Sequence, residues 1–278
     1  MLKNLIKRVK DENKENNTGF NNCLRGTRGI ENDYTKYISE NNTEFQVIGD
    51  IHDNCRASEL YKQIKPLKSP FDRLICIRDW ITLEQEKIIL SNISKSSIRD
   101  IKLMGRRTQM WGGRVTESGI VGKEDLPEWL SSICKTLVHS NIFSEDTAPN
   151  HVLVNRYDIN SGIMPHRDGP LYYPKVAIIS LESDTVFDFW EPYIHSDLIE
   201  EESVKDKPIF SLIVPRLSLL VFQDQCYTDL LHGISSRHQD CIRECNIINL
   251  NEFPNINCNS VIQRYFRTSL TFRHVKSA

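Results

Sequence analysis

Residues 150–174 read Asn150-His-Val-Leu-Val-Asn-Arg-Tyr157, then Asp158-Ile-Asn-Ser-Gly162, then Ile163-Met-Pro-His-Arg-Asp-Gly-Pro-Leu-Tyr-Tyr-Pro174. The first part is rich in β-formers and alternates, which predicts a strand with Leu153, Asn155 and Tyr157 on one face. The second part gathers residues that favour turns, and the chain then extends again toward His166. The stretch therefore predicts a strand, a turn and a second extended segment that carries polar side chains.

His166 and Asp168 are two residues apart, so their side chains point the same way from an extended backbone. An imidazole nitrogen and a carboxylate oxygen can then meet at one divalent metal ion. The His-x-Asp pattern occurs at three places: His166/Asp168, His195/Asp197 and His238/Asp240. Only the first is flanked by the apolar alternation that would fix its geometry, so we expect the metal there.

A further ligand is needed, because the facial triad of non-haem Fe(II) oxygenases has two histidines and one carboxylate. His232 lies in the apolar run Leu230-Leu-His-Gly-Ile234, after a predicted strand and before a glycine that lets the backbone bend. His238 lies among polar residues, and His195 and His274 have less defined surroundings. We expect His232 to be the third ligand; the alternative is a core histidine bonded to the backbone.

The segment from Arg264 to Arg273 alternates so that Arg267, Ser269, Thr271 and Arg273 share one face of a strand. Two inward-facing arginines need an anion. Their Cα atoms are separated by roughly 20 Å of strand, and the two side chains reaching inward leave a gap comparable to a small dicarboxylate. This spacing suits 2-oxoglutarate. The alternative is that both arginines pair with structural carboxylates.

Composition and charge limit the class of protein. The chain has 278 residues, 39% of them hydrophobic, which is enough for one sizeable core. The net charge of −2 argues against bulk polyanion binding, although a local basic patch is still compatible with nucleic acid. We find no run of 18 apolar residues and no secretory signal, and we expect a monomer in the nucleus and cytoplasm with its eight cysteines reduced.

Composition also suggests how the chain is divided. Residues 1–56 are rich in asparagine and charge and predict a disordered extension, followed by one catalytic domain over residues 57–278 with polar insertions near 195–207 and 235–262. The second insertion holds three cysteines near His238, but without the Cys-x2-Cys pairs typical of a zinc cluster. The cysteines are Cys241, Cys245 and Cys258.

Local signals predict two helices and further strands. Thr82-Leu-Glu-Gln85 fits a capping box and predicts a helix start at Thr82. A second helix is expected to open at 125–127, with the proline in its first turn. Residues 175–181 and 185–190 predict a β-hairpin around residues 182–184, and two more strands are expected at 209–214 and 217–222.

Residues 95–114 contain six basic residues and one acid, a local charge of +5. Basic side chains beside an aromatic ring and glycines are typical of nucleic-acid contacts, so Arg106, Arg107 and Trp111 are candidates for substrate binding. The alternative is a solvated hairpin that packs its tryptophan. Tyr172 and Tyr173 are further candidates for substrate contact.

Together these motifs, Asn155-x-Tyr157, His166-x-Asp168, His232 and Arg267-x5-Arg273 in this order, resemble the AlkB-like Fe(II)/2-oxoglutarate dioxygenases. The sequences of residues 150–157, 162–174, 231–234 and 105–113 are most similar to the AlkB homologue 6 branch of this family. The resemblance covers about residues 57 to 275. It implies a mainly β fold with flanking helices, a double-stranded β-helix or jelly-roll.

The resemblance also implies roles for single residues. His166, Asp168 and His232 would hold Fe(II), while 2-oxoglutarate and O2 would be co-substrates. 2-Oxoglutarate would be held by Asn155, Tyr157, Arg267 and Arg273. The family commonly has an asparagine two residues after the first arginine, and this chain has Ser269 there.

The implied reaction is oxidative demethylation of alkylated RNA or DNA, with release of succinate, CO2 and formaldehyde. Two alternatives stay open, because a fold does not fix a substrate. One is a dioxygenase that hydroxylates or demethylates protein. The other is a non-catalytic module that binds nucleic acid or a protein partner.

Overall fold

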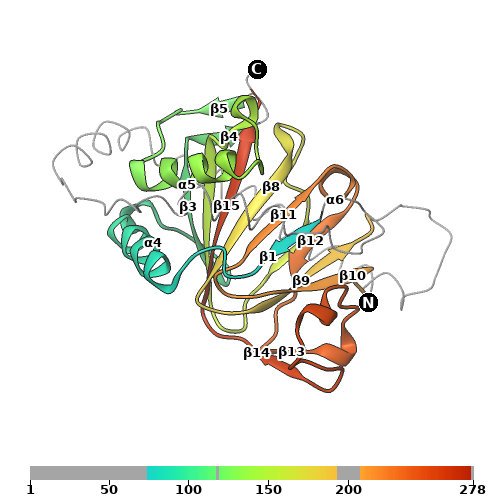
Figure 1. Ribbon diagram of the computed structural model, residues 1–278. Coiled ribbons are helices and arrows are strands. Elements are labelled where there is room, and N and C mark those ends of the chain that lie inside the picture. Colours follow the sequence, from blue (N-terminus) through green and yellow to red (C-terminus); the bar gives the residue numbers. More distant parts are fainter. Residues whose placement is uncertain (1–73, 117–118, 193–206, 277–278) are drawn as a thin grey trace. The chain divides into compact units, whose positions relative to one another are not determined.

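The computed structural model describes residues 74–116, 119–192 and 207–276. Antiparallel strands form a large sheet of seven strands (Figure 1). In spatial order these are β1 (Ile75–Ile77), β11 (Leu219–Gln223), β8 (Tyr172–Leu181), β15 (Arg267–Val275), β6 (His151–Tyr157), β3 (Arg106–Trp111) and β2 (Ile101–Leu103).

A smaller sheet of four strands contains β10 (Phe210–Val214), β9 (Thr185–Trp190), β12 (Leu231–Ile234) and β7 (Ile163–His166). Two short hairpins complete the β structure: β13 (Gln239–Cys241) with β14 (Val261–Gln263), and β4 (Arg114–Thr116) with β5 (Gly119–Val121). Two antiparallel sheets that share one apolar core form the jelly-roll that the sequence predicts.

In the described part of the chain, three α-helices accompany the sheets: α4 (Leu83–Lys95), α5 (Glu128–His139) and the short α6 (Gln225–Thr228). The predicted capping box is confirmed, since the Gln85 amide donates to Thr82 Oγ1 at 3.2 Å and the Thr82 amide donates to Gln85 Oε1 at 2.8 Å. The second helix starts slightly later than predicted, with Pro127 as its N-cap. Short 3₁₀ turns lie at Ser97–Arg99, Glu145–Thr147, Ile242–Glu244 and Leu250–Glu252.

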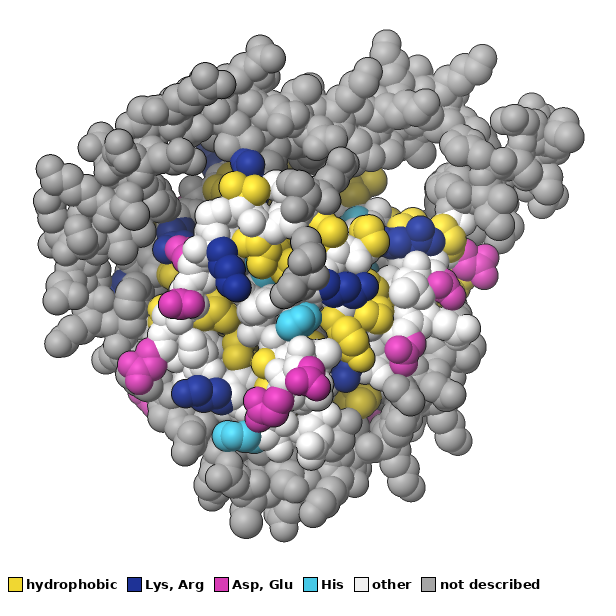
Figure 2. All heavy atoms as spheres, turned by 90° about the horizontal axis from the view of Figure 1, so that it is seen from above, with side chains coloured by type: hydrophobic (Ala, Val, Ile, Leu, Met, Phe, Trp, Pro, Cys, Tyr) yellow, Lys and Arg dark blue, Asp and Glu magenta, His cyan; other side chains and the backbone are white. Residues whose placement is uncertain are grey.

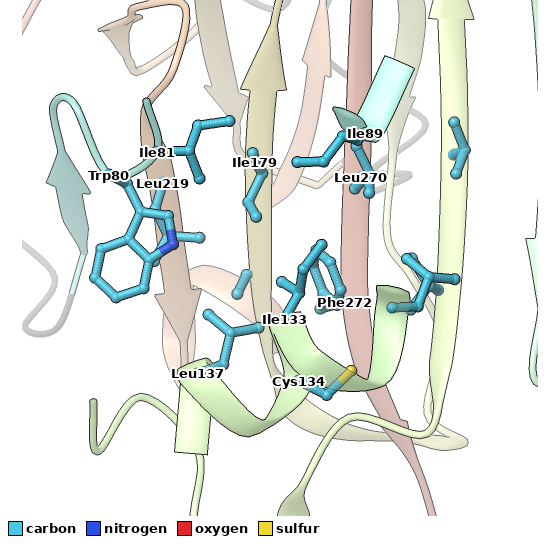
Figure 3. Close-up of a cluster of buried hydrophobic side chains, with 14 of the residues drawn as sticks. Trp80, Ile81, Ile89, Ile133, Cys134, Leu137, Ile179, Leu219, Leu270 and Phe272 are labelled. Carbon is cyan, nitrogen blue, oxygen red and sulfur yellow. The ribbon is translucent and has the colours of Figure 1, made fainter. Parts of the chain in front are cut away.

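The two faces of the large sheet bury different cores. One face packs against α4 and α5 through side chains such as Ile89, Ile133 and Phe272 (Figure 3). The other face meets the small sheet, where aromatic rings including Phe187 and Phe222 fill the space. Because side chains alternate along each strand, the polar residues between these apolar layers are confined to the gap between the sheets.

The predicted hairpin around residues 182–184 is wrong. β8 pairs with β11 and β15 in the large sheet, whereas β9 pairs with β10 and β12 in the small one. Residues 182–184 therefore cross from one sheet to the other, and the chain crosses again between β10 and β11. The segment lacks the Asn-Gly or Asp-Gly pair that is typical of a tight hairpin turn. All of β9 is buried, which fits a strand inside the second sheet better than a strand paired at the edge of the first.

Two parts of the predicted organisation, the N-terminal extension over residues 1–56 and most of the acidic insertion near 195–207, lie outside the described residues. Residues 235–262 are folded: Ile242 and Ile262 pack against Val186 and Ile213 of the small sheet. Among the residues that the structure describes, only His166, Asp168 and His232 are grouped to hold a metal, so the cysteines there form no such cluster. None of the described helices is long and apolar enough to cross a membrane.

Candidate active site

The predicted metal ligands come together in the small sheet. β7 and β12 pair antiparallel with His166 opposite His232, and Asp168 follows two residues after His166. The ligand atoms of the three residues lie within 4.8 Å of one another, and His166 Nε2 is 3.9 Å from Asp168 Oδ1. Gly233 permits this approach, because a Cβ there would lie 2.6 Å from the Ile163 carbonyl oxygen.

The protonation of these ligands suits metal binding. His166 Nδ1 lies 2.8 Å from the Met164 carbonyl, and donation to that oxygen leaves Nε2 free to coordinate. Burial lowers the pKa of His166, and burial and His166 together lower the pKa of His232 to about 3. Both imidazoles are therefore neutral near pH 7. Burial alone would raise the pKa of Asp168, but Arg273 and the histidines outweigh burial and hold it below its usual value.

The predicted co-substrate residues share one face of the large sheet. In the register of β15 and β6, Arg267 lies opposite Tyr157 and Ser269 lies opposite Asn155. All four are buried. Ser269, which stands where the family commonly has asparagine, is thus a neighbour of Asn155 on this face.

Arg267 is a buried cation without a carboxylate partner among the described residues. It is 5% exposed, its Nη2 donates to Ser180 Oγ at 2.8 Å, and its Nε has no hydrogen-bond acceptor. Burial lowers the pKa of its guanidinium to about 10. An uncompensated buried charge costs several kcal/mol, so an anion bound beside Arg267 would restore the balance.

Arg273 is placed differently. Its guanidinium lies 3.2 Å from Asp168 Oδ1 and 4.8 Å from the centre of the Tyr172 ring. The alternative that the arginines pair with protein carboxylates thus holds for Arg273, but its partner is a predicted metal ligand. Arg267 has no such pairing with any residue that the structure describes.

Unpartnered buried polar atoms test whether the site fits iron and 2-oxoglutarate. At the site, five buried donor or acceptor atoms have no hydrogen-bond partner among the described residues. These atoms are Asp168 Oδ2, His232 Nδ1, Arg106 Nε, Arg267 Nε and Arg273 Nε. Two imidazoles and one carboxylate are the donor set of the Fe(II) facial triad, and the guanidiniums are donors suited to carboxylates, so the residues fit both groups.

The predicted substrate residues of β3 are separated by the strand's alternation. Arg106 lies opposite Tyr157 on the face of the site, so Arg107 points to the opposite face and is exposed. Trp111 is 3% exposed and packs edge-on against Trp129 in the core on the helix side. The prediction that Trp111 stacks on a substrate base is therefore wrong, because its apolar ring is used to fill the core.

The structure places Tyr172 inside and Tyr173 outside. Tyr172 is buried against Arg273, whereas Tyr173 is 36% exposed. His151, which sequence reasoning missed, lies opposite Arg273 on β6, and its ring centre is 5.7 Å from that of Tyr172. The alternation that places Leu153, Asn155 and Tyr157 on one face also includes position 151 and could have revealed it.

Comparison with known proteins finds relatives of this chain. No family model matches the chain. A protein of Danio rerio named "Probable RNA/DNA demethylase ALKBH6" is 36% identical over 200 residues, which cover 72% of this chain and 84% of the relative. The chain belongs to the AlkB family of Fe(II)/2-oxoglutarate-dependent dioxygenases. The predicted family is thereby confirmed, and with it the assignment as an oxidoreductase.

More distant similarities extend beyond this relative. The uncharacterized protein L905 of Acanthamoeba polyphaga mimivirus is 28% identical over 208 residues, covering 72% of this chain and 83% of the viral protein. Among solved structures, that of OsALKBH1 has a TM-score of 0.48 at 15% identity and covers 73% of this chain and 100% of the other.

Proposed function

We propose that this AlkB-family dioxygenase oxidatively demethylates alkylated nucleic acid, using Fe(II), 2-oxoglutarate and O2. Succinate, CO2 and formaldehyde would be the products. The observation that carries the proposal is the buried Arg267, which has no carboxylate partner among the described residues and lies on the sheet that faces the triad of His166, Asp168 and His232. A dicarboxylate could satisfy Arg267 with one carboxylate and reach the metal with the other.

The chain's own residues would perform the binding and positioning. His166, Asp168 and His232 would hold Fe(II) by three positions and leave the others open. Iron with 2-oxoglutarate supplies the oxidation of a C–H bond when bound. Arg267 would bind the distal carboxylate with help from Tyr157, and the two sheets would exclude water from the reacting groups.

Nucleic acid is supported as the substrate by the name of the Danio rerio relative and by the charge of the β2–β3 hairpin. Arg106 faces the site, while Lys102 and Arg107 are cross-strand neighbours on the other side of the hairpin. The face shown in Figure 2 carries lysine and arginine side chains on both sides of a visible histidine, with hydrophobic side chains between them and aspartate and glutamate side chains on the same face. Phosphates would meet the cations, and apolar side chains would contact bases.

One experiment tests the reaction and the substrate together. Purified protein with Fe(II) is assayed for succinate formation from 2-oxoglutarate without addition, with alkylated RNA or DNA, and with a pool of methylated peptides. We expect alkylated nucleic acid to stimulate turnover with matching formaldehyde, and Asp168→Ala to abolish both. Stimulation by peptides alone would make a protein substrate the better assignment, and iron binding without any turnover would favour a non-catalytic binding module.

The two faces of β3 supply a matched pair of variants for the nucleic-acid interface. Arg106→Glu reverses the charge that lies on the site face, and Arg107→Glu reverses its neighbour on the opposite face. We expect Arg106→Glu to weaken binding of alkylated oligonucleotide more than Arg107→Glu. Unchanged affinity in both variants would argue against nucleic acid at this hairpin.

The proposal extends to the cellular location and the oligomeric state of the protein. We propose that the protein acts as a monomer in the nucleus and the cytoplasm, where alkylated RNA and DNA are found. Fluorescence imaging of a tagged chain would test the location, and sedimentation of the purified protein would test the monomer.

A further inference from the structure

We propose that His151 is a positioning residue for co-substrate binding, which holds the Arg273 guanidinium between Asp168 and a carboxylate of 2-oxoglutarate. The inference rests on the proposed co-substrate. His151 is not among the residues that the sequence motifs assign to the metal or to 2-oxoglutarate. Its role follows from its register, its burial and the state of its two ring nitrogens.

The strand register places His151 directly beside Arg273. The two residues are opposite each other in the β6–β15 pair, and the Asn150 amide donates to the Arg273 carbonyl at 3.1 Å. Tyr172 belongs to the same group, since its ring lies 5.7 Å from His151 and 4.8 Å from the guanidinium carbon of Arg273. A histidine, a tyrosine and an arginine thus form one cluster next to Asp168.

The His151 ring is polar, buried and unsatisfied. The residue is 2% exposed, and neither Nδ1 nor Nε2 has a hydrogen-bond partner among the described residues. The backbone of Gly113 lies near the ring and raises the pKa of His151, as a weak hydrogen-bond acceptor would. Each unsatisfied buried polar group destabilises the folded protein by about 1–3 kcal/mol, so packing alone would favour an apolar side chain here.

Its neighbours show what an apolar choice would look like. Val176 of β8 lies opposite Arg273 on the same face of the sheet. The next residue of β6 on this face, after His151, is Leu153. An aromatic hydrocarbon at position 151 would fill the same layer without any polar atom. A histidine at this position is explained if its nitrogens gain stronger partners in a state that also holds a ligand.

Arg273 is the partner that the geometry supplies. Its guanidinium already contacts Asp168 at 3.2 Å, its face is covered by Tyr172, and its Nε–H is unpartnered. A bound carboxylate would draw N–H groups of the guanidinium toward itself. His151, as a neutral ring on the adjacent strand, can then accept a hydrogen bond from Arg273, so that one cation contacts Asp168, His151 and the co-substrate together.

The test compares His151→Phe, which keeps a ring of similar size, with His151→Asn and His151→Gln, which each restore an amide acceptor. Binding of 2-oxoglutarate to the Mn(II)-loaded full chain is measured by titration calorimetry, with Mn(II) affinity and Tm measured beside it. We expect the phenylalanine variant to bind 2-oxoglutarate about tenfold more weakly, the effect of one hydrogen bond to a charged group. Its Mn(II) affinity should be unchanged, and its Tm equal or higher.

At least one amide variant should recover most of the affinity, and His139→Asn, an exposed position on α5, should leave every value unchanged. Wild-type affinity in His151→Phe would overturn the inference, as would a fall in Tm with parallel loss of Mn(II) and 2-oxoglutarate. If wild-type protein itself fails to bind 2-oxoglutarate, the proposed function fails instead.

A double-mutant cycle tests whether His151 acts through Arg273. His151→Leu and Arg273→Lys are measured singly and together, so that the result does not depend on folding of the phenylalanine variant. If His151 acts through Arg273, His151→Leu should have little further effect on 2-oxoglutarate affinity once Arg273→Lys is present. Independent, additive losses would contradict a positioning role.

Discussion

Two buried arginines, Arg264 and Arg267, lie three residues apart and have opposite surroundings. Arg264 is 4% exposed, and its Nε and Nη2 donate to the two oxygens of Asp240, each at 2.7 Å. Arg237 donates to the same carboxylate, which also accepts from the Val186 amide. Arg267 is 5% exposed and has one hydrogen bond, to the hydroxyl of Ser180, with no carboxylate among the described residues.

This difference separates structural charge from functional charge. Asp240 is satisfied by protein groups: it pairs with Arg237 and Arg264, and it accepts from the Val186 amide, which links the folded segment of residues 235–262 to β9 of the small sheet. Arg267 is left for a partner that the described chain does not contain. Buried polar groups without a hydrogen-bond or ion-pair partner are expected at functional sites, where a bound ligand supplies the partner.

The largest effect on stability is expected from removing the charge of Asp240, the carboxylate that pairs with Arg264. Asp240→Asn keeps the shape of the side chain but leaves Arg264 and Arg237 without their counter-charge. We expect a loss of about 3–5 kcal/mol in the free energy of unfolding, measured by urea denaturation. Glu84→Gln, which removes an exposed pair with Lys87, should cause no measurable change. A similarly small loss for Asp240→Asn would show that its pairs are not structural.

Removing the unsatisfied cation should have the opposite pattern. We expect Arg267→Met to weaken 2-oxoglutarate binding by about 100-fold or more without lowering Tm, because an uncompensated buried charge is replaced by an apolar chain. Arg267→Lys should restore little of the 2-oxoglutarate affinity, because lysine cannot form a two-point contact with a carboxylate. A marked fall in Tm of Arg267→Met would instead indicate that Arg267 has a structural partner.

The buried histidines predict a pH dependence of stability. Burial and Arg273 lower the pKa of His151 to about 4, and that of His232 is about 3. The unfolded chain takes up these protons near pH 6.5, so the metal-free protein should lose stability as the pH falls below that value. The slope is at most about 1.4 kcal/mol per pH unit for each histidine.

Urea denaturation of metal-free protein between pH 7 and pH 5 measures this slope. His151→Phe removes one of the three histidines whose pKa the fold lowers, which are His151, His166 and His232, and it should flatten the dependence relative to wild type. Equal slopes in both proteins would mean that His151 is not held neutral in the fold.

The smallest effect is expected from the single hydrogen bond that Arg267 does have. Ser180→Ala removes the Oγ acceptor and leaves the guanidinium less fixed. We expect 2-oxoglutarate affinity to fall about fivefold, corresponding to about 1 kcal/mol. Ser140→Ala, at the buried C-cap serine of α5, should not change affinity. Equal effects of both would assign the loss to general destabilisation.

Local rules predicted the parts of the site that depend on strand geometry. The alternation of 150–157 and 264–273 placed Tyr157 and Arg267 on the faces where the structure has them, and the capping box located the start of α4. Trp111 was misjudged because a tryptophan among basic residues resembles a surface stacking group. Its burial depends on Trp129, a residue that local reasoning does not connect to it.

The sequence by itself determined the donor types and their spacing: two histidines and an aspartate for a metal, and two arginines on one strand face. These follow from chain geometry, which repeats every two residues in a strand and needs no knowledge of distant partners. Only the tertiary structure decided that β8 and β9 belong to different sheets and that Arg267 is unpaired. Whether a buried charge is satisfied depends on residues far away in the chain, such as Ser180, that only folding brings beside it.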